Sequence, residues 1–231
     1  MTKNPFKDLS IFERILWVGS LVIIIISFLI SKGGDYLSLI ASLLGATALI
    51  FVAKGYVLGQ VLTVFFAVFY GIISFFFSYY GEMITYLCMT SPIAIMSIIS
   101  WIKHPYKDTN EVEVNTVSKK QIILMNVLTI AVTVIFYFIL KAIGNANLLF
   151  STISVTTSFL ASYLTFLRSP YYALAYAAND IVLIILWILA SCVDSSYITM
   201  VICFVIFLIN DVYGFVNWQK MKKRQDVSVQ E

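Results

Sequence analysis

Long apolar runs with almost no charged residues follow one another along most of this sequence. An α-helix rises ~1.5 Å per residue, so about 20 apolar residues cross the ~30 Å hydrocarbon core of a membrane. Hydrophobic residues make up 61% of the 231 residues and charged residues 12%, whereas soluble domains carry roughly 25% charged residues. The chain is therefore predicted to be an all-α polytopic membrane protein with about eight transmembrane helices, at residues 13–30, 36–53, 57–79, 83–102, 120–140, 147–167, 171–190 and 196–218.

The positions of the basic residues predict the orientation of these helices. Thirteen of the 15 Lys and Arg residues fall on one side of an eight-helix arrangement, and only Lys32 and Lys141 fall on the other. Basic residues concentrate in cytoplasmic loops. We therefore expect a multi-pass protein with both its N-terminus and its C-terminus in the cytoplasm.

The chain is interpreted as a single transmembrane domain with an internal repeat. Residues 36–102 and 147–218 each contain three helices, with a basic residue in the first short turn and a Trp near the end of the third helix. Corresponding helices are four apart and share an orientation, as in a parallel repeat. The other parts are predicted to be an extra N-terminal helix at 11–35, a cytoplasmic loop (interpreted as a solvated connector) with a linker helix at 103–140, and a basic cytoplasmic tail at 219–231.

The last two apolar runs each contain an Asn-Asp pair, and polar side chains inside a membrane are costly unless they face a cavity or a partner. Asn179 and Asn210 both lie ~12 Å from the cytoplasmic ends of their helices, so they can face one another in the antiparallel pair. Carriers bind their substrates near the midplane in this way. Helical spacing adds further residues to the same faces, and we predict a substrate site formed by Asn179, Trp187, Asn210, Tyr213, Tyr176, Asn217, Asp180 and Asp211.

These residue types suit a flat, partly cationic solute that carries hydroxyl groups. Indole and phenol rings attract cationic rings and stack on flat ones, and Asn amides pair with sugar hydroxyls or with a carboxamide. Two interpretations stay open for each Asp, a counter-charge for the solute or a hydrogen bond to a neighbouring helix. Trp218, close to Lys220, is interpreted as an interfacial anchor.

The first half of the chain offers only scattered polar groups within its helices, so the site is predicted to be asymmetric. Gly55, Gly59 and Pro92 are interpreted as close helix packing and a helix kink. The polar groups in question are Gln60, Tyr70, Tyr86, Thr90 and Ser91.

Other classes of protein find less support in the sequence. A membrane-embedded enzyme needs paired acid and base groups, a His cluster or metal ligands. We identify only Asp180 and Asp211 as carboxylates inside the helices, with no His beside them. A structural or channel subunit does not need a cluster of aromatic and amide groups at one depth. Without a nucleotide-binding loop, we expect transport that uses no energy source, and we expect no enzyme activity, cofactor, metal or nucleic-acid partner.

The chain resembles the PnuC family of bacterial vitamin transporters, best known for nicotinamide riboside. The likeness covers about residues 11 to 224. It rests on Gly45 to Lys54, Gly81-Glu82-Met83 leading to Pro92 and Trp101, Arg168 before Tyr171, Asn179 with Trp187, and Asn210-x-x-Tyr213-Gly214-x-x-x-Trp218.

The resemblance implies a fold similar to that of sugar-transporting SWEET proteins, with duplicated three-helix bundles, a linking helix and an extra N-terminal helix. It also implies a homotrimer in the inner or plasma membrane of a bacterium. The implied activity is facilitated diffusion of nicotinamide riboside, an NAD precursor, which cytoplasmic phosphorylation then traps. The family's riboside contacts include Asn, Trp and Tyr residues that match Asn179, Trp187, Asn210 and Tyr213.

One departure from the family pattern concerns the end of the fourth helix. Family members often carry Pro-Met-Gln-Phe there, whereas this chain has Pro92-Ile93-Ala94-Ile95. A polar contact is therefore missing at Ala94. Relatives carry thiamine, riboflavin or deoxynucleosides, and these substrates stay open as alternatives.

Overall fold

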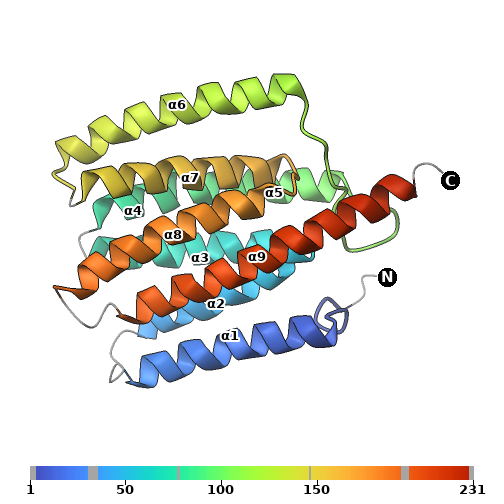
Figure 1. The fold of residues 1–231 in the computed structure, drawn as a ribbon, viewed down its shortest axis with the longest axis horizontal. Helices are drawn as coiled ribbons and strands as arrows, with labels where there is room; N and C mark the ends of the chain where they lie inside the picture. Colours follow the sequence, from blue (N-terminus) through green and yellow to red (C-terminus); the bar gives the residue numbers. More distant parts are fainter. Residues whose placement is uncertain (1–3, 31–35, 77–78, 146, 194–197, 229–231) are drawn as a thin grey trace.

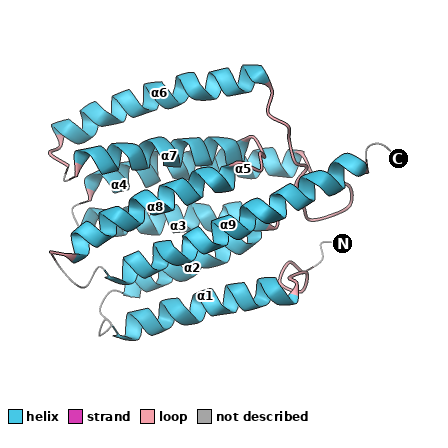
Figure 2. Ribbon diagram, in the orientation of Figure 1, coloured by secondary structure: helices cyan, strands magenta, loops and turns pink. Residues whose placement is uncertain are grey.

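The computed structural model describes residues 4–30, 36–76, 79–145, 147–193 and 198–228. Within them the chain is helical, with loops but no strands, as Figure 2 shows. The helices are α1 (Ile11–Ile30), α2 (Tyr36–Ala53), α3 (Val57–Phe76), α4 (Tyr80–Thr85), the π-helical turn η1 (Tyr86–Thr90), α5 (Ser91–Lys103), α6 (Lys119–Ala142), α7 (Leu148–Phe166), α8 (Tyr172–Ser191) and α9 (Ile198–Val227).

Because α4, η1 and α5 follow one another without a break, they form one span. The described residues then contain eight helices that are long and apolar enough to cross a membrane. The predicted all-α class and the eight predicted spans are confirmed. The eighth span begins at Ile198 and continues to Val227, so residues 219–227, predicted as a tail, are helical.

The spans lie side by side, with both chain ends at the same end of the bundle (Figure 1). We call this the terminal end, and the opposite one the far end. Helix α1 lies along one edge and α6 along the other. Lys141, at the end of α6, lies at the far end as predicted from the charge pattern, whereas Lys32 falls outside the described residues.

A π-helical turn marks the distortion that was predicted at Pro92. Proline has no N–H for the carbonyl of Cys88, and its ring crowds that carbonyl. Helices absorb such a clash with a wider turn, and η1 lies directly before Ser91 and Pro92. The close packing predicted at Gly59 is also present, because a Cβ atom there would lie 2.4 Å from the backbone nitrogen of Val52.

The α2–α3 turn and the α7–α8 turn, both at the terminal end, are built alike. In the first, Gly55 has a φ of 70° and its N–H donates to the carbonyl of Val52 at 2.9 Å. In the second, Arg168 has a φ of 58° and its N–H donates to the carbonyl of Thr165 at 3.0 Å. The residues of the second turn are numbered 113 higher than their counterparts in the first.

Two tryptophans cross between the two halves of the chain. Trp101, at the end of α5, donates its indole N–H to the carbonyl of Thr165 at 3.0 Å. Trp218 in α9 donates to the carbonyl of Val52 at 2.9 Å. The two rings lie 5.5 Å apart and are buried. The interpretation of Trp218 as an interfacial anchor is therefore wrong, because its ring packs at the centre of the terminal end.

The loop between α5 and α6 is only partly the solvated connector that was predicted. Its first part, up to Thr109, is mostly exposed. Its second part packs into the terminal end: Val112 is buried and donates its N–H to the carbonyl of Gly55 at 2.9 Å, and Asn115 donates to the carbonyl of Arg168 at 3.0 Å. Gln225 of α9 accepts from the N–H of Val114 at 2.7 Å. This segment, 110–115, therefore contacts both turns and the last helix.

Candidate functional site

A cavity at the centre of the bundle gathers polar side chains from both halves of the chain. It lies between α2, α3 and η1 on one side and α8 and α9 on the other, and Phe66, Phe204 and Phe207 contribute aromatic walls. Asp180 lies eight residues into α8, which is ~12 Å from the helix start at ~1.5 Å per residue. The polar residues that line this central cavity are Gln60, Thr63, Tyr86, Thr90, Tyr176, Asn179, Asp180 and Asp211.

The two Asn-Asp pairs meet through their aspartates. The carboxyl groups of Asp180 and Asp211 lie close enough to interact, and both side chains are buried. The Oδ2 atom of Asp180 has no hydrogen-bond partner among the described residues.

Asn179 faces α7 and the cavity rather than Asn210. Its Oδ1 accepts hydrogen bonds from the hydroxyls of Ser154, Thr157 and Ser158, at 3.3, 2.8 and 3.0 Å. These hydroxyls fix the orientation of the amide, which leaves its NH2 group to donate to a ligand. One residue turns a helix by about 100°, and this step places Asp180 rather than Asn179 opposite α9.

Three of the predicted site residues in α9 hold the helix against its neighbours and do not line the cavity. Asn210 donates to Ser20 of α1 at 3.2 Å, and Tyr213 donates to Glu13 of α1 at 2.7 Å. Asn217 donates to the carbonyl of Ala53 at 2.8 Å. The structure therefore brings Tyr176, Asn179, Asp180 and Asp211 together and places these three elsewhere.

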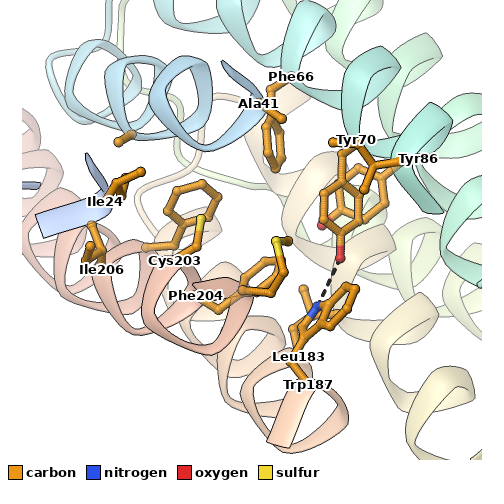
Figure 3. Close-up of a cluster of buried hydrophobic side chains, with 14 of the residues drawn as sticks. Ile24, Ala41, Phe66, Tyr70, Tyr86, Leu183, Trp187, Cys203, Phe204 and Ile206 are labelled. Carbon is orange, nitrogen blue, oxygen red and sulfur yellow. Dashed lines mark hydrogen bonds between the residues drawn. The ribbon is translucent and has the colours of Figure 1, made fainter. Parts of the chain in front are cut away.

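Trp187 lies on the other side of an aromatic wall from the central cavity. Its indole N–H donates to the hydroxyl of Tyr70 at 3.1 Å, drawn as a dashed line in Figure 3. The rings of Tyr70 and Tyr86 lie 4.3 Å apart, and Tyr86 reaches the central cavity. Trp187 instead lines a smaller cavity toward the far end.

The first half of the chain also contributes to this cavity, since Gln60, Tyr86 and Thr90 line it. The asymmetry expected of the substrate site stays a prediction. Ala94 is buried but does not line the cavity. Thr90, four residues earlier, does line it, so the residue that departs from the family pattern is not part of the wall of this cavity.

Two buried carboxylates inside the spans were missed by the sequence analysis, which identified only Asp180 and Asp211. Glu13 is buried in α1, where it accepts from the N–H of Ser10 at 2.6 Å and lies 3.3 Å from the ammonium of Lys54. Serine followed by glutamate three residues later is a capping box, and that signal is visible in the sequence. Glu82 lies one residue before the predicted start of its span, although α4 begins at Tyr80.

Comparison with known proteins agrees with this architecture. Residues 35–220 match the model of a family described as nicotinamide mononucleotide transporter. A nicotinamide riboside transporter PnuC of Neisseria mucosa is 26% identical over 195 residues, which cover 82% of this chain and 74% of that protein. A nicotinamide riboside transporter PnuC of Haemophilus influenzae is 22% identical over 213 residues, which cover 91% of each.

The crystal structure of the vitamin B3 transporter PnuC has the same fold. It superposes with a TM-score of 0.82 and 25% sequence identity, covering 94% of each chain. The resemblance noted from the sequence is confirmed, because the family match spans most of the chain and all but the first of its spans. The chain belongs to the nicotinamide mononucleotide transporter family, and it is a multi-pass membrane transporter.

Proposed function

We propose that this protein carries nicotinamide riboside across the membrane by facilitated diffusion. The observation that carries the proposal is the Asp180–Asp211 pair, which places two neighbouring carboxyl groups beside aromatic rings in the central cavity. The pyridinium ring of nicotinamide riboside has a fixed positive charge. A cation that leaves water needs a counter-charge, and aromatic faces attract it further.

The remaining polar groups of the cavity suit the rest of this solute. Asn179 and Gln60 come from opposite halves of the chain, and their amides match the carboxamide or the ribose hydroxyls. The hydroxyls of Thr63, Thr90 and Tyr176 are further partners. Of the predicted site residues we retain Tyr176, Asn179, Asp180 and Asp211 as direct substrate contacts.

The charge of the cavity also ranks the alternative substrates. Thiamine carries a cationic thiazolium ring, so it is the second candidate. Riboflavin and deoxynucleosides are neutral and would leave the carboxylate without a counter-charge, which is costly in a buried site.

The setting of this transport is part of the same proposal. Both termini face the cytoplasm of a bacterium, on the support of the basic residues and the bacterial relatives. Residues 36–102 and 147–218 are two repeats, on the support of the matched turns and the crossed tryptophans. The protein works as a homotrimer without enzyme activity, and cytoplasmic phosphorylation traps the imported riboside as an NAD precursor.

Isothermal calorimetry on the purified protein tests the substrate assignment. We expect nicotinamide riboside to bind, thiamine to bind more weakly, and riboflavin and deoxyadenosine not to compete. Asp211→Asn should abolish the preference for cations, whereas Asp226→Asn, an exposed carboxylate on the same helix, should leave binding unchanged. Tighter binding of a neutral vitamin than of nicotinamide riboside would contradict the proposal.

A further inference from the structure

A second, smaller cavity lies toward the far end of the bundle. Glu82 and Tyr79 line it from the start of the fourth span, Asn145 and Ser151 line it from the start of α7, and Trp187 lines it from α8. These residues all lie close to helix ends that are remote from the termini. We call it the outer cavity.

Glu82 brings a carboxylate into this cavity without a cationic partner among the described residues. Its side chain is 6% exposed. The Oε2 atom of its carboxyl group has no hydrogen-bond partner among the described residues. A buried carboxylate with an open oxygen is costly, and a cation that enters the cavity would offset this cost. The rings of Trp187 and Tyr79, 5.0 Å apart, add aromatic surface for such a cation.

The rings of Tyr70, Tyr86 and Trp187 lie together between α3, η1 and α8 (Figure 3), with Tyr86 lining the central cavity and Trp187 lining the outer one. Glu82 is two residues from the far end of its span and Asp180 eleven residues from the far end of α8. At ~1.5 Å per residue, the two carboxylates differ in depth by roughly 10–15 Å.

We propose that Glu82 forms an outer subsite for the positively charged ring of the substrate. The outer cavity measures about 20 Å³ in this structure, so the ring occupies it when the far end of the bundle widens, before the ring passes the aromatic wall to the Asp180–Asp211 pair. This inference rests on the proposed function and adds a second position for the same cation. Counter-charges at two depths, with aromatic faces between them, keep the cation paired along its path.

A comparison of charged and neutral substrates tests this subsite. The cation is nicotinamide riboside, and the neutral probe is its dihydro form, which has nearly the same shape but an uncharged ring. Initial uptake of each is measured in liposomes that contain the wild type, Glu82→Gln, Glu82→Asp or Glu113→Gln. Glutamine keeps the size of the side chain but removes the charge. Glu113 is an exposed carboxylate at the terminal end and serves as the matched control.

In Glu82→Gln, we expect uptake of the cation to fall at least about tenfold, the lower end of couplings measured between close charges. Uptake of the neutral form should change by less than about twofold, and Glu82→Asp should keep most of the preference for the cation. Thermal unfolding of each variant checks that it is folded.

Each alternative result has a separate meaning. Equal slowing of both probes in a folded Glu82→Gln protein would overturn the subsite, while transport by the wild type would still support the proposed function. If Glu82→Gln does not fold, Glu82→Ala replaces it: loss of the cation preference in a folded Glu82→Ala protein supports the subsite, and full retention of the preference overturns it. A wild type that transports neither probe would overturn the proposed function and this inference with it.

Discussion

Asn179 and Asn210 offer a matched test of which side chains contact the substrate. Both are buried asparagines at similar depth in consecutive helices, and the sequence pattern predicts the same role for both. In the structure, Asn179 lines the central cavity, whereas Asn210 donates to Ser20 and to the carbonyl of Ile206. The same substitution, Asn→Ala, should therefore have different effects at the two positions.

For Asn179→Ala we expect weaker binding of nicotinamide riboside. A buried polar group of the ligand would lose its partner, which costs about 1–3 kcal/mol or about five- to 150-fold in affinity. Folding should change less, because Thr157 also bonds to the carbonyls of Ile153 and Ser154 and keeps those partners.

For Asn210→Ala we expect nearly normal affinity and a less stable protein. The Ser20 hydroxyl keeps its own bond to the carbonyl of Leu16 at 2.7 Å but loses the amide that donates to it. The loss of two buried hydrogen bonds costs about 1–3 kcal/mol in the free energy of unfolding.

Calorimetric titration and thermal unfolding in the same detergent separate the two effects. The geometry of the cavity would be refuted by an Asn210→Ala protein that unfolds like the wild type but binds as weakly as Asn179→Ala. That result would mean that the inward face of α9 in the substrate-bound protein is the one predicted from the sequence.

Three further expectations follow from the fold and the charge pattern. Trp101→Phe and Trp218→Phe should each lower the midpoint of thermal unfolding, because each leaves one buried carbonyl without its donor at a cost of about 1–3 kcal/mol. An effect at only one of the two positions would contradict the matched roles of the tryptophans. Reporters fused to the C-terminus and inserted at Asp108 should both report the cytoplasm, and an external signal from either would exclude the proposed orientation. Labelled nicotinamide riboside should equilibrate across liposomes without an ion gradient, and accumulation that an ionophore abolishes would disprove facilitated diffusion.

The sequence predicts the spans well because the length of an apolar run is set directly by the thickness of the membrane. It predicts poorly which face of each span points into the protein and which points toward lipid. Lipid and protein interior are both apolar, so the periodicity of hydrophobic residues does not reveal which face of α9 points inward. The Asn-Asp pairs were found because polar groups are rare in such runs, but the packing of α1 against α9 draws Asn210 and Tyr213 outward and leaves Asp211 in the cavity.

Common polar residues inside the spans were the hardest to assign to the cavity from sequence. Gln60 and Thr90 look like many side chains that bond within or between helices, and only the assembled structure shows that they share a cavity. Glu82 was missed for a different reason, because the span predicted from hydropathy alone began one residue after it, at residue 83.

The segment from Val112 to Asn115 sets a limit on how far the terminal end can widen. Val112 is bonded to Gly55 in one half of the chain, and Asn115 is bonded to Arg168 in the other. Three residue steps extend to at most ~11 Å, and the two hydrogen bonds of 2.9 and 3.0 Å bring the maximum reach between the two carbonyl oxygens to about 17 Å. The loop thus limits the distance between the carbonyl oxygens of Gly55 and Arg168 to about 17 Å. A larger separation of the two turns, such as a wide exit at this end would need, requires one of the two hydrogen bonds to break.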